Sequence, residues 1–318
     1  MTLRVAVQMD PMDSINIAGD SSFALMLSAQ ARGAEVWHYD VRTLAYDTGT
    51  NALTAHAAPV TVQRVEGDHY TMGERRRIDL ANDVDVILMR QDPPFDLGYI
   101  SAALMLDRLE GQTLVANDPR EVINAPEKMF VLDYAQFMPP TLIARELDDV
   151  RNFMDQHGSV VVKPLHGNGG KAIFKVDADG TNLSALFEMF NQTWPEPHMV
   201  QPFLPEVSEG DKRIVLVDGE YAGAINRKPG KGEFRSNLAQ GGYAEAATLT
   251  AREEEICAAM GPELKKRGLI FVGIDVIGGK WLTEINVTSP TGIVAIDAFN
   301  GTDTAGKILD AIEARLSA

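Results

Sequence analysis

Residues 269 to 292 read LIFVGIDVIGGKWLTEINVTSPTG. This stretch is the most informative about the fold, since it predicts two apolar strands that carry acidic side chains. The first half carries one acid, Asp275, and the Gly-Gly pair that follows it is a typical hairpin turn. Glu284 and Asn286 follow in the next strand, where side chains two residues apart point to the same face. Folding at the glycines would therefore bring three oxygen ligands together.

Asp275, Glu284 and Asn286 are thus candidate metal ligands. Carboxylate and amide oxygens, together with water and substrate phosphates, are the ligands that magnesium prefers, whereas zinc would favour His or Cys. The alternative is an ordinary strand pair whose polar residues face water or cap a turn. The spacing of these residues leaves both interpretations open.

The composition is that of a soluble globular protein. A chain of 318 residues has room for two or three domains, each with its own core. The net charge of -16 argues against binding to nucleic acid or to an anionic membrane surface. The N-terminus lacks the features of a signal peptide, and no apolar run approaches the ~18 residues of a membrane span. We therefore expect a cytoplasmic protein.

The single cysteine, Cys257, excludes an internal disulfide and a thiolate metal cluster. It shares one helical face with Ile256, Met260 and Leu264, which favours a packing role. The six histidines form no HxH or HExxH pair, so a histidine zinc site is not expected either.

The first 120 residues alternate between strand and helix signals. A helix capped by Asp20 or Ser21 follows the first strand, and the helical SAALMLDRL lies between the last two. The expected strands are 4–9, 34–40, 84–94 and 113–119. This β-α-β pattern predicts a parallel sheet with helices on it. No GxGxxG follows any of these strands, so a Rossmann dinucleotide site is disfavoured.

The pattern changes near residue 123 to a loop, a helix and then strands joined by a glycine-rich turn. We place a second boundary near residue 200, where another apolar strand ends. The predicted domains are 1–123, 124–200 and 201–318.

The glycine-rich turn lies in VVVKPLHGNGGKAIF, residues 160 to 174, with Lys163 on the strand before it. Glycines let backbone amides approach an anion closely, and the lysine supplies the matching charge. The turn comprises Gly167, Asn168, Gly169 and Gly170. It is no Walker A loop, since Lys171 is followed by alanine and then strand. An ordinary hairpin turn is the alternative to a phosphate-binding flap.

Taken one at a time, the other basic residues say less about the function. Lys128 at the start of a helix is typical of a solvated surface charge, and Arg213 beside Asp211 is compatible with a structural salt bridge. Residues 227 to 242, RKPGKGEFRSNLAQGG, hold two arginines and two lysines among glycines. In an acidic protein this favours a mobile lid around an anionic substrate over a disordered loop.

The order of these motifs resembles the ATP-grasp ligases. Lys128 comes first, followed by KPLHGNGG, the hinge QPFL at 201–204, GDKR and the metal trio. The N-terminal segments, the R-x-P…R-x-NLAxGG loop and the closing GLIFVGIDVI…LTEINVTSPTG are similar to the bacterial glutathione synthetase family over nearly the whole chain.

The resemblance implies an α/β architecture: an N-terminal parallel β-α-β domain, followed by an ATP-grasp fold that binds nucleotide between two subdomains. It implies ATP-dependent ligation of gamma-glutamylcysteine to glycine through an acyl phosphate, which gives glutathione, ADP and phosphate. It also implies a magnesium or manganese requirement and a homo-oligomer of two or four copies.

The resemblance further implies roles for individual residues. Lys128, Lys163 and the flap Gly167, Asn168, Gly169 and Gly170 would bind phosphates. Gln201, Pro202, Phe203 and Leu204 would contact adenine, Asp211 would reach toward the ribose, and Asp275, Glu284 and Asn286 would hold metal. Arg213 and Arg227 would be catalytic by stabilising the acyl phosphate and the tetrahedral intermediate, with Arg235, Asn237 and Ser289 binding substrate.

Two other hypotheses stay open. One is a different ATP-grasp ligase that acts on a peptide or protein terminus, since the nucleotide residues are shared and the N-terminal domain and lid select the acceptor. The other is a nucleotide-binding protein without turnover. Retention of both lysines, the metal trio and the arginines argues against the latter.

Overall fold

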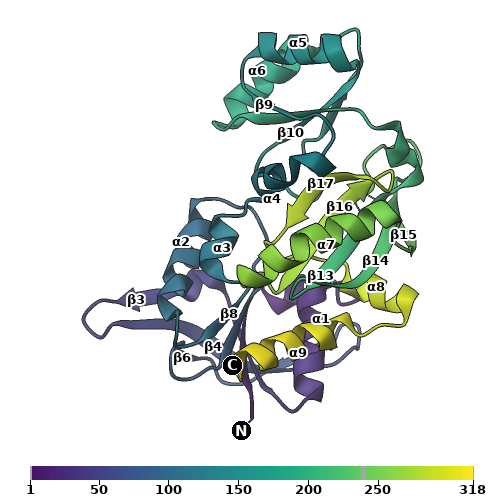
Figure 1. The fold of residues 1–318 in the computed structure, drawn as a ribbon. Coiled ribbons are helices and arrows are strands. Elements are labelled where there is room, and N and C mark those ends of the chain that lie inside the picture. Colours follow the sequence, from purple (N-terminus) through teal and green to yellow (C-terminus); the bar gives the residue numbers. More distant parts are fainter. Residues whose placement is uncertain (1, 238–240, 318) are drawn as a thin grey trace.

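The computed structural model describes residues 2–237 and 241–317, and it contains three sheets (Figure 1). The N-terminal and C-terminal segments together form one body, and the central segment stands apart at the top of the view. No helix within the described residues is long and apolar enough to span a membrane.

The N-terminal sheet has the order β3-β4-β2-β1-β7-β8, with β5 and β6 also paired to β4. Its strands are β1 (Arg4–Gln8), β2 (Glu35–Tyr39), β3 (Ala45–Asp47), β4 (Ala52–Val62), β5 (Tyr70–Met72), β6 (Arg76–Asp79), β7 (Val86–Met89) and β8 (Leu114–Ala116). The four strands predicted from the sequence, β2-β1-β7-β8, are parallel as expected. The antiparallel strands around β4 were not predicted, so the sheet is mixed rather than purely parallel.

Three helices belong to this segment: α1 (Ser21–Ala31), α2 (Leu97–Leu106) and α3 (Pro119–Ile123). Asp20 is the N-cap of α1, because its carboxylate accepts the Phe23 N–H at 2.6 Å. Short 3-10 turns lie at η1 (Met12–Ser14), η2 (Val41–Thr43) and η3 (Asp107–Leu109).

The central sheet is antiparallel, in the order β11-β10-β12-β9. Its strands are β9 (Leu142–Ala144), β10 (Val160–Pro164), β11 (Phe174–Val176) and β12 (His198–Pro202), accompanied by α5 (Leu147–His157) and α6 (Leu183–Thr193). These helices pack on the sheet in a separate core that includes Val150, Phe187 and Val200. The strand after the glycine turn begins only at Phe174, because the backbone of Ala172 takes a left-handed turn with φ of 54°.

The C-terminal sheet has the order β15-β14-β13-β16-β17 and is also antiparallel. Its strands are β13 (Asp211–Val217), β14 (Glu220–Lys228), β15 (Tyr243–Ala246), β16 (Phe271–Ile277) and β17 (Trp281–Asn286). The helices are α7 (Ala251–Lys266), α8 (Ile293–Asn300) and α9 (Thr304–Leu316). Before this sheet come α4 (Glu127–Phe130), η4 (Val131–Phe137) and η5 (Pro205–Glu209).

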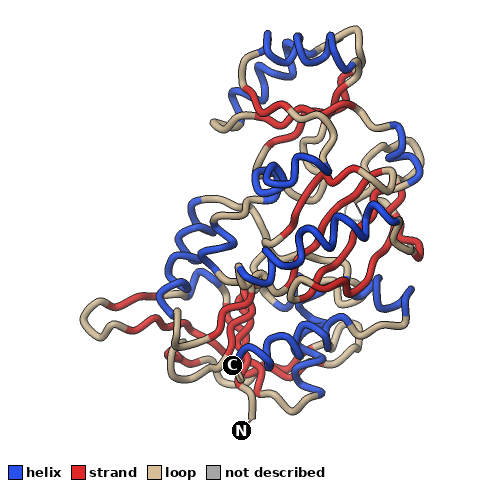
Figure 2. Tube along the Cα trace, in the orientation of Figure 1, coloured by secondary structure: helices blue, strands red, loops and turns tan. Residues whose placement is uncertain are grey.

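Both faces of the C-terminal sheet are covered, as the alternation along β13 shows. Ile214 packs in the core that contains Ile256 of α7, whereas Val215 packs in the core that contains Ile293 of α8. Each core also includes residues of the N-terminal sheet. The interior is therefore continuous between the first and last segments of the chain, which lie side by side in Figure 2.

Helix α9 supplies much of this continuity. Its Ile308, Leu309 and Ile312 are fully or almost fully buried in the core that also holds Phe23 and Met26 of α1. On the outside, Arg32 donates to Asp310 and Glu313. The three sheets span 4–116, 142–202 and 211–286, so the predicted boundary at residue 200 falls within β12. The division into 1–123, 124–200 and 201–318 stays a prediction.

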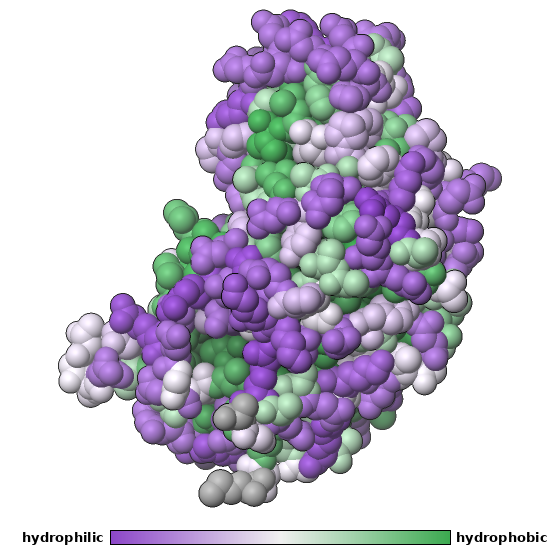
Figure 3. All heavy atoms as spheres, in the orientation of Figure 1, coloured by the Kyte–Doolittle hydropathy of each residue, from purple (hydrophilic) through white to green (hydrophobic). Residues whose placement is uncertain are grey.

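The face of the molecule seen in Figure 3 is mostly polar, in keeping with the net charge of -16. Figure 3 shows hydrophilic side chains over most of the visible face, with apolar patches on the upper lobe and at the left edge.

Candidate active site

The hairpin of β16 and β17 forms as the sequence predicts. Its register pairs Asp275 with Glu284, and Asn286 follows two residues later on the same face. The Asn286 amide donates to Asp275 Oδ2 at 3.3 Å. The turn at Gly278 and Gly279 therefore brings the three candidate ligands together, as expected.

Two buried arginines meet the carboxylate of Asp275. Arg213 on β13 donates through Nε to Asp275 Oδ1 at 2.6 Å and through Nη2 to Oδ2 at 3.0 Å. Arg227 on β14 lies 2.9 Å from Oδ1. Burial opposes ionisation of Asp275, but the two guanidinium groups outweigh it and hold the pKa of this carboxyl well below its usual range. Arg213 and Arg227 thus lie together at one carboxylate.

Arg213 forms a salt bridge with Asp275 and not with Asp211, the acid close to it in the sequence. Asp211 pairs instead with Arg227, directly across the β13-β14 ladder, at 2.6 Å. The same Oδ2 accepts the Ser236 hydroxyl at 3.0 Å, and within the described residues Oδ1 has no hydrogen-bond partner. Burial raises the pKa of Asp211 to about 6 despite Arg227.

The two lysines approach from the central segment. Lys128 on α4 donates to Gly167 O at 2.7 Å, and its Nζ lies 3.4 Å from Glu284 Oε1. Lys163 on β10 donates to Gln201 Oε1 at 3.1 Å. Burial lowers the pKa of Lys163, whereas for Lys128 the burial effect is outweighed by Glu284 and Glu127, which raise its pKa. Lys128 is therefore not the solvated surface charge that its position alone suggests, since it is buried, as is Lys163.

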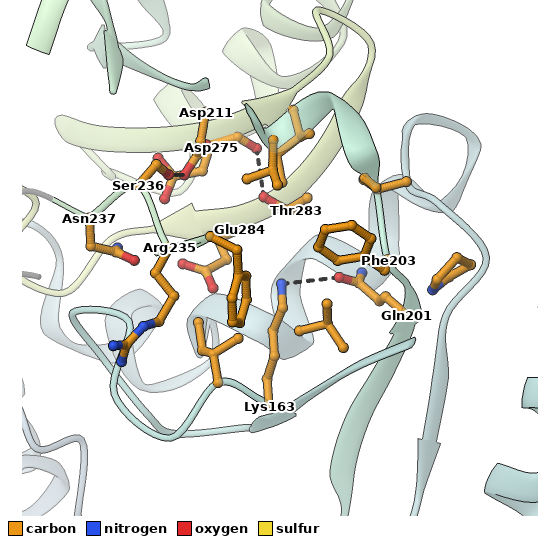
Figure 4. Close-up of a pocket in the computed structure, with 17 residues that line it drawn as sticks. Lys163, Gln201, Phe203, Asp211, Arg235, Ser236, Asn237, Asp275, Thr283 and Glu284 are labelled. Carbon is orange, nitrogen blue, oxygen red and sulfur yellow. Dashed lines mark hydrogen bonds between the residues drawn. The ribbon is translucent and has the colours of Figure 1, made fainter. Parts of the chain in front are cut away.

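A cavity lies between the central and C-terminal sheets, and Figure 4 shows Lys163 and Glu284 pointing into it. The hinge residues Gln201, Pro202, Phe203 and Leu204 line this cavity together with Asp211, Asp275, Arg235 and Asn237. Apolar side chains, among them Val161, Ile173 and Ile277, form the rest of the wall. An apolar slot that ends in three carboxylates and a lysine suits an aromatic base with a charged tail.

The flap covers part of this region. Gly169 and Gly170 have φ of 61° and 74°, a conformation that favours glycine. Gly170 O accepts a hydrogen bond from Arg235 of the lid at 3.1 Å. Lid and flap are therefore in direct contact through an arginine that was expected to bind substrate.

Within the lid, Arg235 is already neutralised by Glu233 at 2.6 Å. Figure 4 shows its guanidinium directed away from Asp211 and Asp275. Asn237 lines the cavity, whereas Leu238, Ala239 and Gln240 of the same stretch lie outside the described residues. Phe234 faces Phe203 of the hinge, with ring centroids 6.2 Å apart.

A second cavity of about 280 Å³ adjoins the first and shares Glu284 and Asn237 with it. It is lined by Arg213 and Arg227 and by two acids, Asp92 and Glu127. Burial raises the pKa of Glu127 to about 7. Asn168, Gly169, Asn286 and Ser289 also contribute to the wall. Ser289 donates its hydroxyl to Gln91 O at 2.7 Å.

Sequence reasoning did not single out Asp92 or Glu127. Asp92 follows directly on an expected strand, VDVILMRQDPP, and Glu127 precedes Lys128 in NAPEK. The position of Asp92 beyond the carboxyl end of a parallel strand was a usable signal. Ser236 and Phe234 were hidden within the irregular lid, where no periodicity identifies a contact.

The residues at this site fit a divalent cation of the magnesium type. Among the described residues Glu284 forms an ion pair with Lys128 alone, and it lines both cavities. The Asn286 amide keeps its oxygen available, since its nitrogen makes the hydrogen bond. No group of three or more His, Cys, Asp or Glu side chains suited to a metal occurs in the described part of the chain.

Two family models cover almost the whole sequence. Residues 3–122 match the prokaryotic glutathione synthetase N-terminal domain, and residues 127–301 match the prokaryotic glutathione synthetase ATP-grasp domain. The chain belongs to the prokaryotic glutathione synthetase family. The family resemblance inferred from the ordered motifs is thereby confirmed.

Curated relatives agree with this membership. The chain is 54% identical over 315 residues to the glutathione synthetase of Rhodopseudomonas palustris, with 99% of both chains covered. The glutathione synthetase of Brucella melitensis is 50% identical, with 99% of this chain and 100% of the relative covered. Membership of the glutathione synthetase family with full-length identity near half makes the protein an ATP-dependent ligase that binds ATP.

Solved structures share the fold at low identity. The D-cycloserine synthetase DcsG has a TM-score of 0.69 at 16% identity and covers 98% of this chain and 99% of its own. The ATP-grasp ligase PsnB, solved with a phosphomimetic precursor variant, Mg and ADP, has a TM-score of 0.64 at 18% identity, with 99% of both chains covered. These likenesses confirm the predicted ATP-grasp architecture of the glutathione synthetase family.

Proposed function

We propose that the protein joins the cysteinyl carboxylate of gamma-glutamylcysteine to the amine of glycine, at the expense of ATP. The observation that carries this is the cluster of Arg213, Arg227 and Asp275 beside Glu284, at the junction of the two cavities. One cavity suits a nucleotide and the other an amino-acid-sized ligand. Glu284 lines both, so a phosphoryl group could pass between them at this point.

The proposed chemistry has two steps. The substrate carboxylate attacks the terminal phosphorus of ATP and forms an acyl phosphate with release of ADP. The amine of glycine then attacks the acyl carbon, and phosphate leaves. Phosphoryl transfer depends on the protein chiefly for positioning and charge neutralisation.

The cations of the site divide this work. Lys128 and Lys163 enter from the central segment and would neutralise nucleotide phosphates. Arg213 and Arg227 line the second cavity and would stabilise the acyl phosphate and the tetrahedral intermediate. Because both arginines are held by Asp275, their guanidinium planes are fixed before substrate arrives.

We propose that Asp275, Glu284 and Asn286 hold magnesium, with manganese as a substitute. A bound divalent ion would neutralise phosphate charge during transfer. The flap of Gly167 to Gly170 and the lid residues Arg235 and Asn237 would cover the nucleotide and exclude water from the acyl phosphate. Ser289, bonded to Gln91 O, would shape the second cavity.

The test is turnover of purified protein with magnesium-ATP and glycine, with and without gamma-glutamylcysteine. We expect ADP and glutathione to form together, and only when both amino substrates are present. ADP release that ignores gamma-glutamylcysteine, or that requires a peptide or protein terminus instead, would favour another ATP-grasp ligase. An assembly of two or four copies in the cytoplasm stays a prediction that sedimentation of the purified protein and cell fractionation test.

A further inference from the structure

The second cavity carries charges of both signs. Arg213 and Arg227 line it from β13 and β14, whereas Asp92 enters from the loop after β7 and Glu127 from the start of α4. A ligand that fills such a cavity must itself present both signs. Amino acids and short peptides do so, because each carries an ammonium group and a carboxylate.

The positive and negative side chains of this cavity differ in whether they already contact a group of opposite charge. Both arginines are matched by Asp275 or Asp211. By contrast, the carboxylates of Asp92 and Glu127 accept no hydrogen bond and form no ion pair within residues 2–237 and 241–317. The cavity therefore holds two carboxyl groups that have no direct partner, and a cationic ligand group would stabilise their charged form.

The topology independently points to a ligand beside Asp92. Strand β1 is flanked by β2 on one side and β7 on the other, so the connections diverge at its carboxyl end. In sheets with parallel strands, ligands bind outside the carboxyl ends at such a switch point. Asp10 follows β1, Asp92 follows β7, and the Asp92 N–H donates to Asp10 Oδ2 at 2.9 Å.

We propose that Asp92 and Glu127 form a subsite for the α-ammonium group of an amino-acid substrate. The inference rests on the proposed function, in which both gamma-glutamylcysteine and glycine bring such a group. Although Asp92 keeps exposed surface through which a ligand can reach it, partial burial and the nearby Asp10 raise its pKa, so a substrate cation would relieve an existing electrostatic cost. The substrate carboxylate would then face Arg213 and Arg227.

The critical variant is Asp92→Asn, which keeps the backbone contact to Asp10 and removes one charge. Asp96→Asn is the matched control in the same loop. Asp96 caps α2 by accepting the Tyr99 N–H at 2.9 Å, and asparagine caps a helix equally well. Glu127→Gln is the second test variant.

Two measurements separate the possible sources of the ammonium group. Calorimetry compares binding of gamma-glutamylcysteine with binding of N-glutarylcysteine, which has the same shape but lacks the α-amino group. Steady-state kinetics gives KM for gamma-glutamylcysteine and for glycine separately.

We expect Asp92→Asn to weaken gamma-glutamylcysteine binding at least about tenfold, the effect of losing a contact between charged groups, and to leave the glutaryl analogue unchanged. A rise in KM for glycine alone would assign the same subsite to glycine. The proposal is overturned if Asp92→Asn and Glu127→Gln bind every ligand like the wild type, or weaken both peptides equally. If the wild type binds gamma-glutamylcysteine but forms no glutathione, the proposed function is contradicted, whereas the proposed subsite is not.

Discussion

Arg213 and Asp275 face each other across neighbouring strands and are joined by two hydrogen bonds, at 2.6 and 3.0 Å. Both side chains are almost completely buried. The second arginine, Arg227, meets the same carboxylate and continues the chain of charges to Asp211. The centre of the C-terminal sheet is therefore an ionic network whose members depend on one another.

Replacing Asp275 by asparagine should cost about 3–5 kcal/mol of unfolding free energy, because Arg213 and Arg227 would keep buried charges without their shared partner. Urea denaturation measures the loss. Asp218→Asn is the control, since Asp218 pairs with Arg315 and Lys265 near the surface and should cost about 1 kcal/mol or less. Equal losses in the two variants would contradict the network.

Glu284→Gln should lower the catalytic rate at least ~100-fold, the scale of losing one strong transition-state contact. Stability should fall less than in Asp275→Asn, because Lys128 keeps its hydrogen bond to Gly167 O and the neighbouring Glu127 when Glu284 loses its charge. Glutathione formation at saturating substrates measures the rate. Glu245→Gln, on the outer strand β15 and paired with Lys228, should retain full activity. Near-normal turnover of Glu284→Gln would remove the metal assignment.

Because the thiol of Cys257 is buried, we expect the stability of the protein to depend on pH in the alkaline range. Burial raises its pKa from 9.0 to about 12. Below pH 9 both folded and unfolded thiols are protonated, whereas between pH 9 and 12 only the unfolded chain loses the proton, so stability falls as pH rises through that window. Between pH 8 and about 10.5 the wild type should lose about 2 kcal/mol more than Cys257→Ala. Denaturation curves that shift in parallel for both proteins would disprove this.

Asn117 bridges the first and last segments of the chain. Its amide donates to Phe271 O at 2.8 Å and to Val287 O at 2.9 Å, and its oxygen accepts the Phe271 N–H at 2.7 Å. Asn117→Ala should cost about 3 kcal/mol, because three buried backbone groups lose their partner. Thermal denaturation of Asn82→Ala, whose amide contact is exposed, gives the comparison. A cost no greater than that of Asn82→Ala would show that the bridge is dispensable.

The sequence predicted strands correctly where hydrophobic periodicity and turn residues indicated the same boundaries. The parallel strands and the β16-β17 hairpin follow from apolar runs bounded by glycine and proline. Strand β4, ALTAHAAPVTV, was missed because alanines and a proline give it little strand propensity. Its pairing with four other strands comes from tertiary contacts that no local pattern encodes.

The candidate site shows the same division. Strand alternation predicts that Glu284 and Asn286 share a face, and the hairpin adds Asp275. The partner of Arg213 was not predictable, because Asp211 and Asp275 are both acids at strand positions and only the register between β13 and β16 selects one. Asp92 and Glu127 come from segments distant in sequence, and only the folded chain brings them to one cavity.

The packing of α9 against α1 has a consequence for biosynthesis. The core around Phe23 and Met26 is completed by Ile308, Leu309 and Ile312, which follow far later in the sequence, in α9. The first helix therefore keeps part of its apolar face exposed until α9 has been synthesised. We expect a nonsense mutation ahead of α9 to produce a chaperone-dependent, rapidly degraded chain, even though every residue assigned to the active site would already be present.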